Sequence, residues 1–165
     1  MKNIDNIIYT LKHRAAFREC VKRYLKGEDR KQLLLRADVH DMDKVILYNF
    51  LDFKDVKNFH RTNASHHTES NKKRLNRYDY LEMIMDWECA RYTKEDKPLN
   101  AYETLYKFYP ELEKKILPIL KELKLDYGGE KKFFDRRILN AVKNLEIDED
   151  YIIHEIERFL LLKII

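Results

Sequence analysis

The fold is decided by residues 78–94, which read YDYLEMIMDWECARYTK. On a helical wheel, the apolar and aromatic side chains of this segment cover nearly the whole circumference. They are Tyr78, Tyr80, Leu81, Met83, Ile84, Met85, Trp87, Cys89 and Ala90. A helix that is apolar all round lies inside a bundle rather than on its surface. We therefore predict an all-α, single-domain helical bundle with residues 78–94 at its centre.

Further helices are predicted on both sides of this segment, from apolar residues at helical spacing and from capping residues. The predicted ranges are 3–26 with Gly27 as a stop, 29–39, a short helix over 43–51 capped by Asp43, 101–109, 110–124 with a kink at Pro118, 130–145, and 149–163 capped by Asp148. Residues 52–76 are polar and contain neither Gly nor Pro. We expect them to form an ordered loop with one or two short helical turns.

The composition is that of a soluble globular protein. The 165 residues are 38% charged and 44% hydrophobic, and the length suits one domain with a real core. Lysine and arginine number 33 against 29 acidic residues, which gives a net charge of +4. This mild excess suits a small anionic substrate but is too small to predict nucleic-acid binding.

The cysteines and the chain ends predict a cytoplasmic protein. Cys20 and Cys89 stand far apart without a pairing pattern, so we interpret them as reduced core residues. No segment approaches the roughly 20 apolar residues of a membrane span, and the N-terminus lacks a signal-peptide core. The closing run, residues 159–165, is too short to span. It predicts either a buried final helix turn or a homodimer contact.

Asp86 places a carboxylate on a mostly apolar face of the central helix. Its neighbours three and four positions away are Glu82, Met83, Cys89 and Ala90. A buried carboxylate is costly unless a positive charge meets it. A metal ion would meet that need, and so would an arginine or lysine. The sequence leaves both explanations open.

Five of the six histidines fall within residues 13–67. Taken singly, His13 reads as a core histidine and His60 as a surface residue of a loop. Together with the adjacent His40-Asp41 and His66-His67 pairs, they indicate a metal site, because imidazole and carboxylate ligands suit divalent metals. One or two ions are expected, with Mn, Fe, Zn, Ni, Co and Mg all open.

The order of these residues resembles the HD superfamily of metal-dependent phosphohydrolases. The resemblance lies in His13, His40-Asp41-Met42-Asp43-Lys44, the additional His60 and His66-His67, and Asp86. A closer resemblance, over about residues 10–105, is to a family of small uncharacterised bacterial and phage proteins of HD type. It rests on residues 40–44, on Arg61-Thr62-Asn63-Ala64-Ser65-His66-His67, and on Glu82-Met83-Ile84-Met85-Asp86-Trp87 followed by Ala90. The Gly-Tyr-Pro signature of the branch that hydrolyses cyclic dinucleotides is absent.

The C-terminal third shows no such resemblance. We predict one HD-like domain over residues 1–165, with a metal-site core over about 3–105 and C-terminal helices over about 110–165. The resemblance implies an α-helical fold and a metal site but supplies no substrate, and we expect hydrolysis of a phosphoester, with a nucleotide or cyclic nucleotide as the substrate. One metal would take His13, His40, Asp41 and Asp86, and a second would share Asp41 and use His60 with His66 or His67. Asp41 and Lys44 would be catalytic, and Lys44, Arg61 and Arg91 would meet phosphate charge.

Two other functions remain open at this stage. A few HD-superfamily members use the same ligands in a di-iron oxygenase, so metal identity and an oxygen requirement would separate that activity from hydrolysis. The chain could also be a non-catalytic module that binds a nucleotide or a protein. The complete set of ligands argues against this last interpretation, because degenerate members usually lose ligands.

Overall fold

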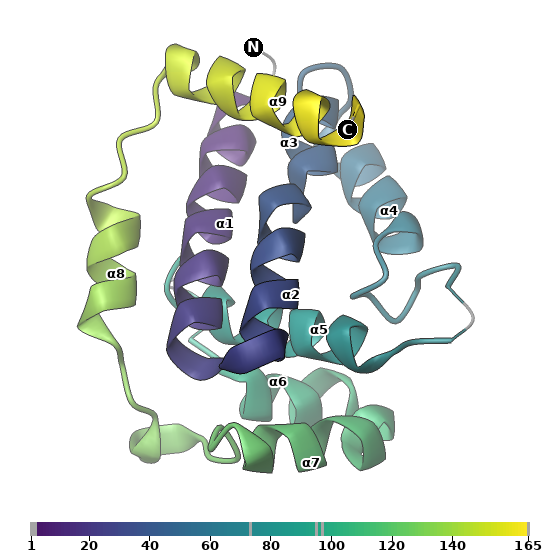
Figure 1. Cartoon of the computed structure of the whole chain (residues 1–165), viewed down its shortest axis with the longest axis vertical. Coiled ribbons are helices and arrows are strands. Elements are labelled where there is room, and N and C mark those ends of the chain that lie inside the picture. Colours follow the sequence, from purple (N-terminus) through teal and green to yellow (C-terminus); the bar gives the residue numbers. More distant parts are fainter. Residues whose placement is uncertain (1–2, 73, 95, 97, 165) are drawn as a thin grey trace.

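Helix α5 (Arg77–Ala90) runs through the middle of the structure, as the sequence predicts (Figure 1). It begins with a capping box, in which the Asn76 side chain accepts from the Asp79 N–H and the Asp79 carboxylate accepts from the Asn76 N–H. Its buried side chains contact four other helices, α1, α2, α6 and α7. The protein is therefore an all-α bundle organised around α5.

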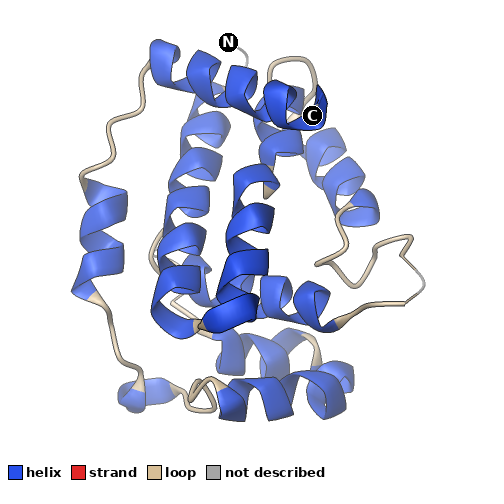
Figure 2. Ribbon diagram, viewed as in Figure 1, coloured by secondary structure: helices blue, strands red, loops and turns tan. Residues whose placement is uncertain are grey.

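The computed structural model describes residues 3–72, 74–94, 96 and 98–164, and within these ranges it contains helices and loops but no strand (Figure 2). The remaining α-helices are α1 (Ile4–Tyr24), α2 (Gly27–Val39), α3 (Met42–Leu47), α4 (Phe53–Asn63), α6 (Ala101–Phe108), α7 (Glu113–Glu122), α8 (Arg136–Lys143) and α9 (Glu149–Ile164). Short 3₁₀ turns lie at Pro110–Leu112 and Gly129–Lys131.

The buried apolar residues form two separate cores. The larger core gathers side chains of α1, α2, α5, α6, α7 and α8 around Phe17, Leu33 and Ile84. The smaller core joins the first turns of α1 to α3, α4 and α9, and it includes Leu11 and Met42. Along α1, His13 lies between the residues of the smaller core and those of the larger one. Polar side chains such as that of His13 therefore lie between the two cores.

The segment 52–76 is more helical than the sequence predicts. Helix α4 spans eleven residues, and the Asp52 side chain caps it by accepting from the Asp55 N–H at 3.1 Å. Only Val56 and His60 of this helix are buried, so the core-facing stripe is too sparse to reveal a helix by periodicity. The predicted cap at Asp43 is wrong: α3 begins at Met42, and the Asp43 carboxylate contacts His60 instead.

The C-terminal helices are shorter than predicted, except for the last. The α-helical part of the predicted helix 130–145 is α8 alone, which starts at Arg136, because a 3₁₀ turn and a non-helical stretch over 132–135 precede it. The cap of α9 is confirmed, since the Asp148 carboxylate accepts from the Tyr151 N–H at 2.8 Å. Helix α7 continues through Pro118.

Helix α9 crosses the ends of α1 and α3 and packs on the smaller core (Figure 1). The prediction that its closing turn is buried is wrong, because Leu160, Leu161, Leu162 and Ile164 are exposed. Ile165 lies outside the described residues. The homodimer contact stays a prediction. Within the described residues, every helix is too short or too polar to cross a bilayer.

Candidate metal centre

The predicted ligands converge between the two cores, from three helices, one helix junction and one loop. We call His13, His40, Asp41, His60, His66, His67 and Asp86 the His/Asp cluster. Helix α1 supplies His13, the α2–α3 junction supplies His40 and Asp41, the last turn of α4 supplies His60, the following loop supplies His66 and His67, and α5 supplies Asp86. The histidines His13, His40, His60 and His66 are each at most 6% exposed. The cluster is thus an interior feature of the fold.

One part of the cluster joins His13, His40 and Asp86. The His13 Nε2 atom lies 2.6 Å from Asp86 Oδ1, and His40 Nε2 lies 3.5 Å from the same oxygen. One ligand atom from each of these residues falls within 4.8 Å of the others, which is close enough to surround a single ion. The partly buried carboxylate of Asp86 is therefore met by two imidazoles.

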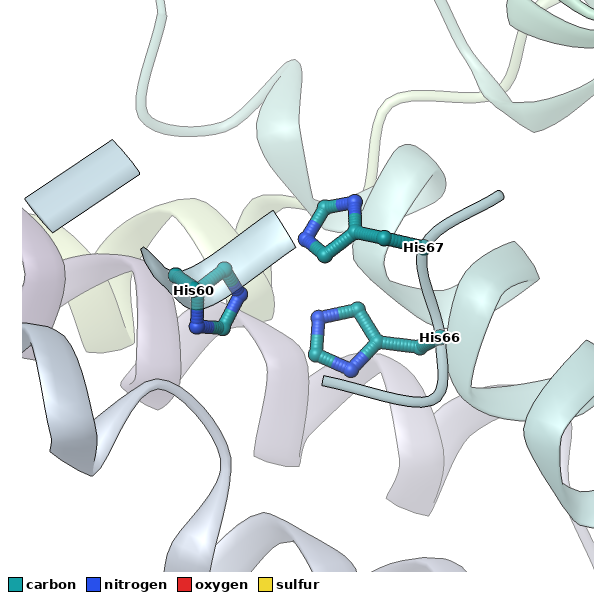
Figure 3. Close-up of side chains that lie close together, drawn as sticks. All are labelled: His60, His66 and His67. Atoms are coloured by element: carbon teal, nitrogen blue, oxygen red, sulfur yellow. The ribbon is translucent and has the colours of Figure 1, made fainter. Parts of the chain in front are cut away.

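The other part of the cluster joins His60, His66 and His67, whose rings converge in Figure 3. Their ring centroids lie 4.4–5.2 Å apart, and one nitrogen from each falls within 4.8 Å of the others. Asp41 borders this group, because its Oδ1 lies 3.1 Å from His60 Nε2 and 3.9 Å from His66 Nε2. The same oxygen lies 3.8 Å from His40 Nε2, so Asp41 stands between the two parts of the cluster.

Carboxylates behind the rings turn the Nε2 atoms inward. His60 Nδ1 is 2.8 Å from Asp43 Oδ2, and His40 Nδ1 is 3.0 Å from Glu82 Oε1. His66 Nδ1 lies 3.2 Å from that same Glu82 oxygen. A carboxylate on one ring nitrogen fixes the ring and leaves the other nitrogen available, which is the usual arrangement around metal-binding histidines.

The atoms that face the middle of the cluster lack partners. Among the residues that the structure describes, five buried atoms of the cluster make no hydrogen bond: Nε2 of His40, His60, His66 and His67, and Oδ1 of Asp41. A buried polar atom without a partner costs roughly 1–3 kcal/mol, so five of them in one place call for an occupant. Nitrogen and carboxylate donors that converge in this way fit a divalent metal ion. The residues present therefore fit one or two such ions.

The backbone at the α2–α3 junction is held in an unusual conformation. Asp41 has a φ of 58°, in the left-handed region that non-glycine residues rarely adopt. Arg14 stabilises the junction from α1, since its Nε donates to the His40 carbonyl at 2.7 Å and its NH2 donates to the Asp38 carbonyl at 3.0 Å. These bonds satisfy carbonyls at the end of α2 that have no partner within the helix. Strained residues of this kind concentrate at functional sites.

Without a metal, the histidines of the cluster differ in their pKa and therefore in their charge. Burial opposes a charge on His40, but the carboxylates of Asp41, Asp86 and Glu82 outweigh it and raise the pKa of His40 to about 10. Burial, together with a neighbouring imidazole, lowers the pKa of His67 to about 3. At neutral pH His40 is therefore protonated, while His67 is already neutral and able to bind a metal.

Lys44 touches the cluster directly. Its Nζ lies 2.8 Å from Asp41 Oδ2, while the other oxygen of Asp41 faces the histidines. Burial opposes ionisation of Asp41, yet Lys44 and the imidazoles of His40 and His60 hold the pKa of that carboxyl well below its usual range. Asp41 is thus an anion that faces a cationic side chain on one side and the histidine nitrogens on the other.

A cavity of about 410 Å³ opens onto the cluster and is lined by His13, Asp41, His60, His67 and Asp86. Its walls carry the cationic side chains of Lys44, Lys57, Arg61 and Lys94. They also carry aromatic side chains, including a Trp87 ring that stacks on Tyr109 with centroids 4.9 Å apart. Concave sites with apolar walls and a few converging polar groups are typical of small-molecule binding.

Arg91 does not reach this cavity, although the sequence suggested a contact with substrate. Its Nε donates to Glu88 Oε1 at 2.9 Å and its NH2 donates to the Phe133 carbonyl. The guanidinium is buried against the segment that precedes α8. We assign it no role in substrate binding.

Comparison with models of protein families, with curated proteins and with solved structures finds no match for this chain. The description of the site therefore rests on its own geometry. A buried cluster of histidine and aspartate side chains, able to hold a metal ion, opens into a cation-lined cavity.

Proposed function

We propose that this chain is a metal-dependent phosphohydrolase of HD type that acts on a phosphoester of a nucleotide or cyclic nucleotide. The observation that carries the proposal is the set of five unpartnered buried atoms facing the middle of the His/Asp cluster. They lie beside a cavity whose charged side chains attract anions.

The donor set supports two metal positions that share Asp41. One position would use His13, His40 and Asp86, and the other would use His60 with His66 and His67. Divalent metals at such sites lower the pKa of bound water and offset charge on phosphoryl oxygens. The carboxylate of Asp41, which stands between the two groups, would serve both positions.

The cavity walls suggest how a substrate would be held. Lys44, Lys57, Arg61 and Lys94 outnumber the two carboxylates that line the cavity, Asp41 and Asp86. The excess of positive charge favours a phosphorylated molecule. The Trp87 and Tyr109 rings offer aromatic surface of the kind on which nucleobases stack. Lys44 would neutralise phosphate charge close to the metals, and Arg61 would assist from α4.

A direct test loads the metal-free protein with manganese, iron, cobalt, nickel, zinc or magnesium, one at a time. Each form is then incubated with a panel of nucleotides and cyclic nucleotides, with and without oxygen. Phosphoester cleavage that depends on metal and proceeds without oxygen would support the proposal. Oxygen consumption by the iron form, with no cleavage, would favour the di-iron oxygenase. Metal or nucleotide binding without turnover would favour the binding module.

A further inference from the structure

A single carboxylate oxygen contacts two histidines that belong to different parts of the His/Asp cluster. Glu82 Oε1 lies 3.0 Å from His40 Nδ1 and 3.2 Å from His66 Nδ1. His40 lies in the group with His13 and Asp86, and His66 lies in the group with His60 and His67, while both histidines also form a third group with Asp41, between the other two. The two rings lie 4.7 Å apart between centroids. Glu82 is therefore a physical link between the two candidate metal positions.

The second oxygen of Glu82 is anchored from the opposite side. Arg36 NH1 donates to Glu82 Oε2 at 2.8 Å and to Asp79 Oδ1 at 2.9 Å. Asp79 is fully buried, and its other oxygen accepts from Lys72 Nζ at 2.6 Å. Glu82 lies one helical turn before Asp86 on α5, so the same rigid helix carries a ligand and this anchored carboxylate. The orientation of Oε1 is therefore determined by groups outside the cluster.

We propose that Glu82 is a positioning residue that orients one ligand of each metal position, so that both positions depend on this one carboxylate. The proposal rests on the metal site of the proposed function. A metal that binds His40 or His66 through Nε2 requires a proton on Nδ1, and that proton points at Glu82 Oε1. Because Arg36 anchors Glu82 from outside the cluster, this one oxygen can accept from both Nδ1 atoms, and a change at Glu82 acts on both positions. Partners of this kind typically contribute 10–100-fold in metal affinity.

The substitution Glu82→Gln distinguishes this role from simple filling of space. Glutamine has nearly the same shape, but one of its two terminal atoms is an NH₂ group that only donates. If the NH₂ group faces Arg36, two donors oppose each other. If it faces the histidines, both Nδ1 atoms must accept, which moves their protons to the Nε2 atoms. Either arrangement disturbs both metal positions together.

Asp43→Asn is the matched control. The Asp43 carboxylate stands behind His60 alone, with its two oxygens 2.8 and 3.0 Å from His60 Nδ1. It contributes the same kind of contact as Glu82, but only to one metal position. Loss of this carboxylate should weaken one binding step and leave the other unchanged.

The experiment titrates metal-free protein with Co²⁺ and follows the visible absorption of each binding step, with calorimetry in parallel. For Glu82→Gln we expect both steps to weaken by roughly 10–100-fold and the absorption of both to change. For Asp43→Asn we expect one step to weaken. A Glu82→Gln protein in which only one step weakens, or neither does, would overturn the proposal.

If Glu82→Gln fails to fold, Arg36→Gln provides the second variant. Arg36 is partly exposed, and its loss removes the anchor of Glu82 while both histidine contacts remain. We expect both steps to weaken together by a smaller factor, and a change in one step alone would overturn the proposal. A wild-type protein that binds no Co²⁺ would overturn this proposal and the proposed function together. Binding of Co²⁺ without phosphoester cleavage by any metal form would overturn the proposed function alone.

Discussion

His60 Nε2 and Asp41 Oδ1 lie 3.1 Å apart, and neither buried atom makes a hydrogen bond. The two residues come from different helical segments, and each is held from behind. Asp43 contacts the far nitrogen of His60, and Lys44 contacts the far oxygen of Asp41. The two atoms thus face each other while the opposite atom of each side chain is held, which is the arrangement that a metal position requires.

His67→Ala should lower the metal content by one ion per chain, because it removes one of the three nitrogens that converge beside Asp41. The fold should persist, since His67 lies in a loop and is only partly buried. Elemental analysis of the loaded variant checks the stoichiometry, and circular dichroism checks the fold. The exposed His154→Ala serves as control and should leave the metal content unchanged. Equal stoichiometry in wild type and His67→Ala would exclude a second position at this loop.

Lys44→Ala should lower turnover of a phosphoester substrate by roughly 10- to 1,000-fold, as expected when one charge that stabilises the transition state is lost. Metal should remain bound, because the metal-facing oxygen of Asp41 is not the one that Lys44 contacts. Steady-state kinetics with an identified substrate, together with metal analysis, measures both effects. Lys54→Ala is the control, since Lys54 is exposed and does not line the cavity. Full activity of Lys44→Ala would remove the role given to this side chain.

Metal binding should release protons at neutral pH. The raised pKa of His40, about 10, means that this imidazole is charged in the metal-free protein, and a metal must displace its proton. Affinity should therefore rise with pH between 6 and 8, by about tenfold per unit for each proton displaced. Calorimetry in buffers of different ionisation enthalpy counts the protons. A pH-independent affinity with no proton release would contradict this account of His40.

Arg91→Met should destabilise the protein by about 3–5 kcal/mol, because it leaves the buried Glu88 carboxylate without its cationic partner. Metal content should stay the same, since Arg91 contacts Glu88 and the Phe133 carbonyl rather than the cluster. Urea unfolding measures the first effect and elemental analysis the second. Arg136→Met, at an exposed position on α8, should change the unfolding free energy by less than about 0.5 kcal/mol. A stable Arg91→Met protein that has lost metal would contradict the assignment of Arg91 to an ion pair with Glu88 outside the metal site.

The sequence predicts the central helix and the convergence of the ligands well, for a local reason. Because apolar residues surround α5, the helix must lie at the centre of the bundle. Asp86 on this helix then needs a partner in the interior. The inward stripe of α1 places His13 there too. The central helix and the inward direction of His13 follow from side-chain type and helical spacing, whereas the full ligand set was expected from the resemblance to the HD superfamily.

The supporting carboxylates could not be predicted in the same way. Asp43 looks like a helix cap and Glu82 like one charge among many, because their functions depend on rings brought from elsewhere in the chain. For Glu82, the available signal was its position one turn before Asp86 on the same face of α5. Helix α4 was not predicted at its full length, because Phe53 and Phe59 are exposed and only two of its residues are buried, which leaves no apolar stripe at helical spacing. Its signal was the capping residue Asp52.

The most direct test of the central claim is the metal content of the wild-type protein beside Asp41→Asn, after both are loaded with the same divalent metals and freed of excess ions. Asparagine keeps the size of the side chain and tolerates the left-handed backbone at this position, where φ is 58°. The wild-type chain should retain one or two ions. Asp41→Asn should retain fewer, because the charged oxygen between the two groups is gone. A wild-type protein that retains none of the metals offered, or an Asp41→Asn protein that retains as many ions as wild type, would contradict the account of the His/Asp cluster as a metal centre.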